Sequence, residues 1–158
     1  MSESVWPVPD SADVRSIESI LAAFDAALTF QPGGAPDFRR LKSLFLPVGN
    51  LVCPKPWNVA LDVDGFQHFV REALPKLNLD QAGFAERNQI VKRYTIGGVN
   101  AVFAYYTLHS PPTAKEAFGK GVNMFHIVEF DGKFAIASCV WEDESATAPT
   151  PAELRPRQ

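Results

Sequence analysis

The stretch that most constrains the fold runs from Gly121 to Glu144, and its sequence is GVNMFHIVEFDGKFAIASCVWEDE. Asp131 and Gly132 interrupt it, and both residue types tolerate the positive φ of a two-residue hairpin turn. We therefore expect antiparallel strands over residues 121–130 and 133–142. Both faces of these strands are apolar, whereas a sheet with one wet face alternates apolar and polar residues. The hairpin should be covered twice, by helices of the chain and by a second copy of the chain.

Strict alternation along the two strands assigns each apolar side chain to one face of the hairpin. The first face receives Phe125, Ile127, Ile136 and Val140. The second face receives Met124, Val128, Ala137, Cys139 and Trp141.

Three segments within residues 11–77 have helical periodicity. A stripe at three- and four-residue steps predicts a first helix that begins at Ser11 and ends near Thr29. Asp37 is the expected cap of a second, short helix, and Asp62 or Asp64 caps a third that ends near Pro75. Between them, residues 50–53 fit a short strand that Pro54 and Pro56 should exclude from the centre of a sheet.

Residues 84–109 change to an extended pattern. We expect a strand over 84–96 with Tyr94 on the same face as Phe84 and Ile90, a turn at Gly97-Gly98, and a strand over 99–109. Together with the hairpin these strands form a four-stranded antiparallel meander. Helices followed by strands are typical of the α+β class.

The composition predicts one domain over residues 1–146 and a disordered tail over 147–158, which is rich in Pro, Thr and Ala. A net charge of −3 with scattered Lys and Arg argues against nucleic-acid or membrane partners. Cys53 and Cys139 are expected to be buried reduced thiols, and we expect no metal and no cofactor. The N-terminus lacks the basic start and apolar run of a signal peptide, so a cytoplasmic location is expected.

Five segments carry a resemblance to a known family: residues 17–21, 62–66, 84–87, 118–123 and 136–144. Over about residues 11–145 the chain resembles the SnoaL-like branch of the nuclear transport factor 2-like superfamily. The resemblance implies an α+β cone, in which three N-terminal helices pack on a strongly curved antiparallel sheet around an internal pocket. That superfamily includes ketosteroid isomerases, scytalone dehydratase, polyketide cyclases, transport adaptors and proteins without known activity, so the resemblance implies a shape rather than one reaction.

An isomerase of this shape needs a carboxylate base and an oxyanion donor, and a dehydratase needs a histidine base with tyrosine donors. The catalytic candidates are His126, Tyr106 and Glu86. Each also has an ordinary structural explanation: a hydrogen-bonded core histidine, a packed strand tyrosine, or a glutamate on a wet face. The candidates for contact with a ligand are Trp57, Phe69, Tyr94, Tyr106, Asn123 and His126.

Three hypotheses follow. The first is a homodimer, paired through the outer face of the sheet, whose cone binds a small apolar ligand. The second is a cofactor-independent isomerase, cyclase or dehydratase that uses His126 with a tyrosine or Glu86. The third is an adaptor that binds another protein through the outer face of the sheet.

Overall fold

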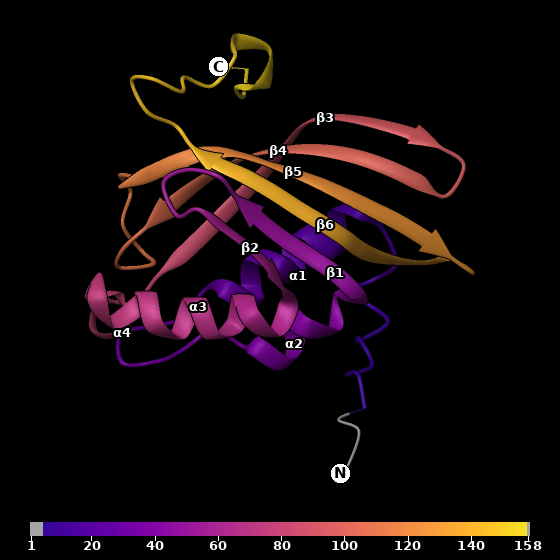
Figure 1. Cartoon of the computed structure of the whole chain (residues 1–158), viewed down its shortest axis with the longest axis horizontal. Helices are drawn as coiled ribbons and strands as arrows, with labels where there is room; N and C mark the ends of the chain where they lie inside the picture. Colours follow the sequence, from indigo (N-terminus) through magenta and orange to yellow (C-terminus); the bar gives the residue numbers. More distant parts are fainter. Residues whose placement is uncertain (1–4, 158) are drawn as a thin grey trace.

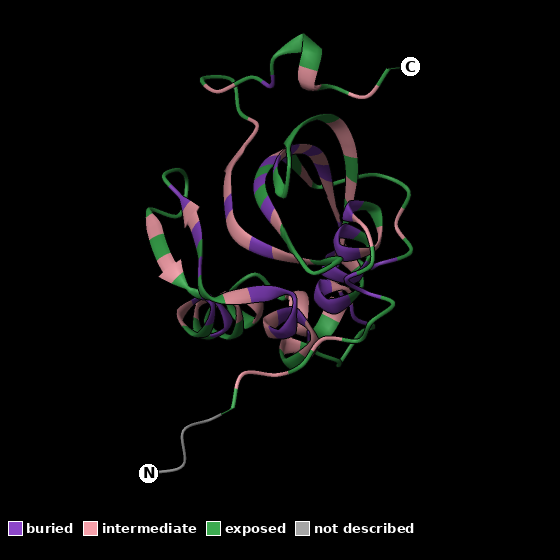
Figure 2. Ribbon diagram, turned by 90° about the vertical axis from the view of Figure 1, so that its right-hand side faces the viewer, coloured by how far each residue is buried: buried purple, intermediate pink, exposed green. Residues whose placement is uncertain are grey.

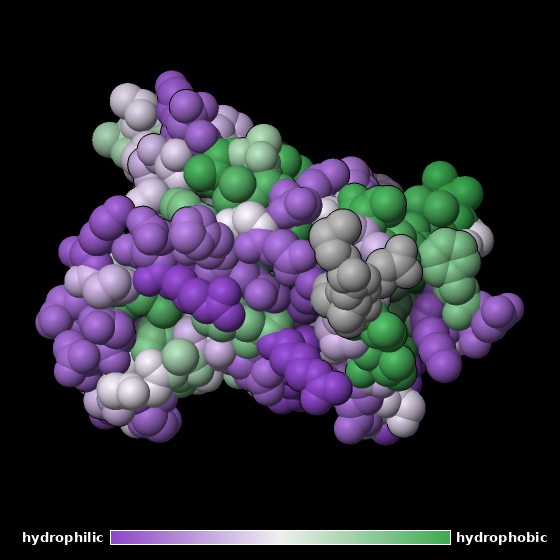
Figure 3. Space-filling model, turned by 60° about the horizontal axis from the view of Figure 1, so that its bottom comes forward, coloured by the Kyte–Doolittle hydropathy of each residue, from purple (hydrophilic) through white to green (hydrophobic). Residues whose placement is uncertain are grey.

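A layer of helices lies on one side of a long, curved sheet in the computed structural model, which describes residues 5–157 (Figure 1). The helices are α1 (Ile17–Leu28), α2 (Phe38–Ser43), α3 (Val63–Lys76) and the short α4 (Leu79–Ala82). Seen from the helical side, the surface is mostly hydrophilic, with apolar side chains in separate patches (Figure 3). None of the helices in residues 5–157 is both long enough and apolar enough to cross a membrane.

The starts of the helices follow from their capping residues. Of the two caps predicted for α3, Asp62 and Asp64, the structure has Asp62, whose Oδ1 accepts a hydrogen bond of 2.7 Å from the Gly65 backbone N–H. The first helix starts later than predicted, at Ser16 instead of Ser11. Ser16 and Ser19 form a reciprocal capping box with two hydrogen bonds of 3.0 Å, which satisfies two of the backbone donors at the start of the helix.

The sheet contains the predicted meander and two further strands, in the order β2-β1-β6-β5-β4-β3. The strands are β1 (Phe45–Cys53), β2 (Val59–Asp62), β3 (Ala85–Ile96), β4 (Val99–His109), β5 (Gly119–Phe130) and β6 (Lys133–Asp143). The β5–β6 turn has the predicted positive φ at both central residues, 50° at Asp131 and 76° at Gly132.

The placement of β1 corrects the prediction for residues 50–53. This strand is longer than expected and lies inside the sheet, parallel to β6 on one side and antiparallel to β2 on the other. Pro54 and Pro56 fall in the connection that follows β1, so they remove no hydrogen bond from its ladder. Pro47 does lie within β1, at the irregularity between Phe45 and Asn50 where the pairing register shifts.

A β-bulge at Ala137 reverses the faces predicted for the second half of β6. Ile127 pairs with Ile136 and His126 pairs with Ser138, which leaves Ala137 as the extra residue. One extra residue moves every later side chain to the opposite face. Cys139 and Trp141 therefore lie on the helical side with Phe125, and Val140 lies on the outer side with Met124.

A second bulge, at Val91, has the same effect on β3. Ile90 pairs with Ala104 and Lys92 pairs with Phe103, so Val91 is unpaired. Tyr94 therefore does not share the face of Ile90, as alternation predicted, but lies on the outer face of the sheet with 54% of its surface exposed.

The core fills the concave side of the sheet, where α1 packs into the curve (Figure 2). Ile20, Phe24 and Phe125 are at most 3% exposed. The rings of Phe24 and Phe125 meet edge to face with centroids 5.2 Å apart. Burial of each side chain of this size contributes about 1.5–3 kcal/mol to folding, so contacts of this kind hold the helix in the cone.

The segment after β6, for which the composition predicted disorder, has a defined path on the face of the sheet opposite the helices (Figure 1). The backbones of Ser145 and Ala148 exchange hydrogen bonds of 3.1 and 3.2 Å, and a 3-10 turn at Ala152–Leu154 contacts β3 and β4. Arg155 Nη2 lies 3.6 Å from Glu144 Oε1 and anchors the segment to the end of the sheet.

Candidate functional site

A cavity of about 320 Å³ lies between the helices and the concave face of the sheet. Its walls come from α1, the β1–β2 connection, α3 and the strands β3–β6. Most of the lining side chains are apolar, and they include Leu28, Leu51, Phe66, Phe69, Val70, Leu74, Phe84, Leu108, Phe118 and Trp141. Its size and composition fall within the range of small-molecule sites.

Aromatic rings from three elements frame one part of the cavity. Trp57, in the β1–β2 connection, meets Phe69 of α3 edge to face at 5.4 Å between ring centroids. Phe66 of α3 meets Trp141 of β6 in the same way at 6.0 Å. Trp57 is 38% exposed, so it belongs to the rim of the cavity, whereas Phe66 is buried.

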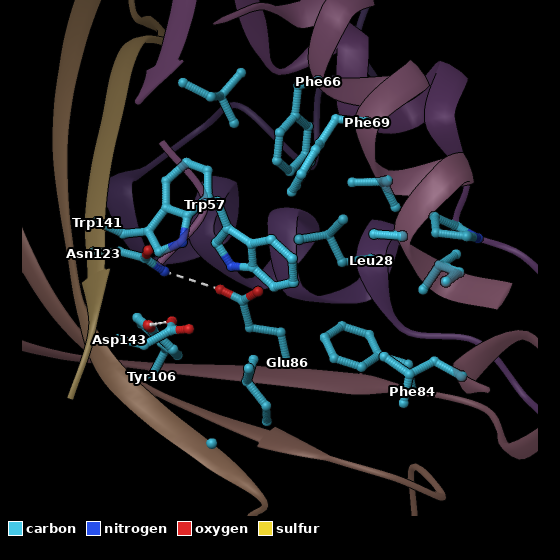
Figure 4. Close-up of a pocket in the computed structure, with 18 of the residues that line it drawn as sticks. Leu28, Trp57, Phe66, Phe69, Phe84, Glu86, Tyr106, Asn123, Trp141 and Asp143 are labelled. Atoms are coloured by element: carbon cyan, nitrogen blue, oxygen red, sulfur yellow. Dashed lines mark hydrogen bonds between the residues drawn. The ribbon is translucent and has the colours of Figure 1, made fainter. Parts of the chain in front are cut away.

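Glu86, on β3, provides a carboxyl group at the polar end of the cavity (Figure 4). Its Oε1 accepts hydrogen bonds from Asn123 Nδ2 at 2.9 Å and from Asn88 Nδ2 at 3.0 Å. Its Oε2 has no hydrogen-bond partner among residues 5–157. Burial, reinforced by the negative charge of Asp25, raises the pKa of Glu86 from 4.5 to about 7, although the two amide hydrogen bonds oppose the shift.

Asp25 of α1 lies behind Glu86 and ties the helix to β3. It accepts hydrogen bonds from the backbone N–H of Asn88 at 2.8 Å and from Asn88 Nδ2 at 2.6 Å. Asn88 Oδ1 in turn accepts from Asn123 Nδ2 at 2.9 Å, which closes the network. Burial raises the pKa of Asp25 to about 6, against the effect of the Asn88 hydrogen bonds.

A second polar pair, Tyr106 and Asp143, lines the same cavity (Figure 4). The Tyr106 hydroxyl donates a hydrogen bond to Asp143 Oδ1. Burial, and then this hydrogen bond, raise the pKa of Tyr106 above its ordinary value. Gly121 pairs with Tyr106 across the sheet, and a Cβ at this position would overlap the hydroxyl, so the space for Tyr106 depends on glycine.

Cys139 completes the polar end. Its Sγ donates to Asn123 Oδ1 at 3.7 Å, and burial raises the pKa of the thiol well above its ordinary value. The thiol therefore stays protonated at neutral pH and is no nucleophile in this setting. In the part of the chain that the structure describes, no group of three or more His, Cys, Asp or Glu side chains is arranged to hold a metal ion.

The structure brings together five of the seven residues named from the sequence. The residues that line the cavity are Trp57, Phe69, Glu86, Tyr106 and Asn123. The other two, His126 and Tyr94, lie on the outer face of the sheet. His126 is exposed, and its Nδ1 hydrogen bonds with Ser138 Oγ at 2.8 Å.

The placement of His126 corrects both explanations given for it, since the side chain is neither in the pocket nor in the core. Asn123 and Phe125 point inward, and alternation turns His126 away from the cavity. The bulge at Val91 does the same to Tyr94.

Sequence reasoning missed Asp25, Asn88 and Asp143. A signal existed for Asp25, because it stands four residues after Leu21 and three before Leu28, on the apolar side of α1. Asp143 stands two residues after Trp141 and so shares its face, but this spacing becomes informative only once Trp141 is known to face inward.

Comparison with known proteins gave no matching family model and no match among curated proteins. Similar solved structures include a Nostoc punctiforme protein of unknown function with a cystatin-like fold (12% identity, 82% of this chain and 90% of that one, TM-score 0.65). A Mycobacterium tuberculosis protein of unknown function is also similar (13% identity, 87% of this chain and 79% of that one, TM-score 0.63). So is a nuclear transport factor 2-like protein from Novosphingobium aromaticivorans (11% identity, 71% of this chain and 73% of that one, TM-score 0.57). The chain therefore has the cystatin-like cone fold of nuclear transport factor 2-like proteins, which confirms the α+β architecture that the sequence resemblance implied.

Proposed function

We propose that the protein binds a small, mostly apolar molecule in the cone and orients it by one polar group. The observation that carries this proposal is a cavity of about 320 Å³ with an apolar lining and a carboxyl oxygen, Glu86 Oε2, that has no hydrogen-bond partner in the described part of the chain. Transfer of the apolar part of a ligand from water into such a cavity lowers its free energy, and the carboxyl group fixes the orientation of the ligand.

The test is to fill the cavity with a side chain. Ala73 lines it from α3, whereas its neighbour Glu72 is exposed on the same helix. We expect Ala73→Trp to weaken binding of 2-naphthylmethanol at least tenfold in isothermal titration calorimetry, and the matched variant Glu72→Trp to bind like the wild type. Unchanged affinity in Ala73→Trp would refute binding inside the cone.

A second candidate function, cofactor-independent proton transfer, is favoured by Glu86. A general base works best when its pKa is near the working pH, and the pKa of Glu86 is about 7. In this proposal the unpartnered oxygen of Glu86 removes a proton from a carbon next to a carbonyl group, which is the step common to isomerases and cyclases. His126 has no role in it.

The assay for proton transfer is exchange of the acidic C–H protons of 2-tetralone in D₂O, followed by NMR. We expect Glu86→Gln to slow the enzyme-dependent exchange by about 10²-fold or more. If the wild-type protein gives an exchange rate no higher than that in buffer alone, Glu86 is not a base for this class of substrate, and binding remains as the function.

We further propose that two copies of the chain pair through the outer face of the sheet. The four α-helices lie on the other side of the sheet, and on this face the 3-10 turn at Ala152–Leu154 contacts β3 and β4 (Figure 1). Tyr94, Val99 and Met124 expose 43–57% of their surfaces. A stable interface buries about 800 Å² per partner, and a soluble monomer seldom leaves that much apolar surface wet. In sedimentation velocity we expect a dimer that Met124→Lys converts to monomer; a wild type that stays monomeric at all concentrations would leave the adaptor function as the explanation of this face.

A further inference from the structure

The charged side chains that line the cavity are all acidic. Glu86 and Asp143 line it, and Asp25 lies directly behind Glu86. Among the described lining residues, none is Lys, Arg or His. The groups that face Glu86 from α1, β4, β5 and β6 are Asp25, Tyr106, Asn123, Asp143 and Cys139, together with Asn88 of its own strand. All of these are acids, thiol, phenol or amides, so residues 5–157 supply no cation inside the cavity to balance Glu86.

Nearby basic side chains are held elsewhere. Arg87, next to Glu86 in sequence, donates through Nη2 to the Pro112 carbonyl at 2.9 Å. Arg93 pairs with Glu18 at 2.8 Å, and Lys120 lies 3.6 Å from Glu144 at the end of the sheet. A positive charge in the cavity therefore has to come with the ligand.

The walls beside Glu86 are of the kind that accepts an organic cation. The Glu86 carboxyl group points toward the space between Trp57 and Trp141 (Figure 4). Tryptophan faces attract cations through the quadrupole of the ring, and clusters of aromatic side chains bind ammonium groups for this reason. Phe66 and Phe69 continue the aromatic wall behind the two indoles.

We propose that the cone selects an organic amine, bound as its ammonium ion, with the apolar body among the aromatic and aliphatic side chains and one N–H donated to Glu86 Oε2. This inference rests on the proposed ligand-binding function and adds the class of ligand. An ammonium ion supplies the charge that a buried carboxylate lacks, whereas a carboxylate or phosphate ligand meets two carboxyl groups and no cation. A neutral ligand gains the apolar contacts alone.

The experiment compares three probes that share one ring system: 2-naphthylmethylamine, 2-naphthylmethanol and 2-naphthoate. At pH 8 we expect isothermal titration calorimetry to show the amine binding at least tenfold more tightly than the alcohol, and the naphthoate more weakly than both. Equal affinities, or tighter binding of the alcohol, would overturn the amine inference and leave the binding pocket standing. If none of the three probes binds, the proposed pocket function fails together with the inference.

The pH dependence of binding and the release of protons provide a second test. Glu86 has to ionise to pair with the ammonium ion, so with a pKa of about 7 the affinity for the amine should fall about tenfold from pH 8 to pH 6. At pH 6, binding should release about 0.9 proton per amine, measured from titrations in two buffers of different ionisation enthalpy. The alcohol should show neither effect, and an amine affinity that does not depend on pH would count against Glu86 as the partner.

Variants locate the effect. Glu86→Gln should abolish the preference for amine over alcohol and its pH dependence. Glu129→Gln, an exposed position on β5, is the matched control and should retain the full preference. A preference that persists in Glu86→Gln would overturn the assignment.

Discussion

The most discriminating prediction concerns the stability of the Glu86→Gln variant as a function of pH. The folded protein raises the pKa of Glu86 from 4.5 to about 7, mainly because the carboxylate is buried. A group whose pKa is raised on folding holds its proton more tightly in the folded state. Its contribution to the free energy of unfolding is therefore complete below pH 4.5 and is lost as the pH rises to about 7.

The magnitude follows from the size of the shift. At about 1.4 kcal/mol per pKa unit, the interval from 4.5 to about 7 corresponds to a loss of about 3 kcal/mol in wild-type stability. Glutamine cannot ionise, and its amide oxygen can still accept from Asn88 and Asn123. Relative to the wild type, Glu86→Gln should therefore gain about 3 kcal/mol in the free energy of unfolding between pH 4.5 and pH 8.

The assay is urea unfolding followed by tryptophan fluorescence at pH 4.5 and pH 8, at one ionic strength. Asp25, whose pKa is raised to about 6, makes the wild type lose stability over an overlapping pH range, but it is present in both proteins and largely cancels in the comparison. The exposed control Glu129→Gln should show no such change. If the difference between Glu86→Gln and the wild type is the same at both pH values, the buried carboxyl group does not have the raised pKa on which the reasoning depends.

Three further predictions concern the architecture of the site. Gly121→Ala should lower the free energy of unfolding by about 2 kcal/mol in urea titrations, because its Cβ would overlap both the Tyr106 hydroxyl and the backbone oxygen of Glu142; a neutral effect would mean that the ring and the backbone of β6 both have room to move. Deletion of Ala137 removes the extra residue and leaves Ile136, Cys139 and Trp141 in regular alternation on the helical side, so near-UV circular dichroism should keep its native aromatic signals, and loss of those signals would contradict the assigned register. Ser16→Ala breaks the capping box and should cost about 1 kcal/mol in thermal unfolding; retention of full stability would argue for a different helix start.

Much of the fold follows from local patterns in the sequence. The Asp131-Gly132 turn, the helical stripe of α1 and the Asp62 cap act over a few residues, and each is present in the structure, although α1 begins at Ser16 and not at Ser11. The order of helices followed by strands then predicted the α+β class, and the resemblance to nuclear transport factor 2-like proteins implied the cone. Part of the site followed as well, because Glu86, Tyr106 and Asn123 stand on strands that were placed correctly.

What only the tertiary structure decided depends on single-residue shifts and distant pairings. Nothing local in the sequence marks Ala137 or Val91 as bulges, yet each bulge exchanges the two faces of its strand and so determines that Trp141 lines the cavity and Tyr94 does not. Likewise Asp25 and Asn88 are 63 positions apart in the sequence but are joined by a hydrogen bond in the structure. The charge of Asp25 near Glu86 contributes to the raised pKa of Glu86. Side-chain periodicity reports a face only while the register is unbroken, and burial of a charge is a property of the assembled layers, so the chemistry of this pocket emerges only when helix and sheet are in contact.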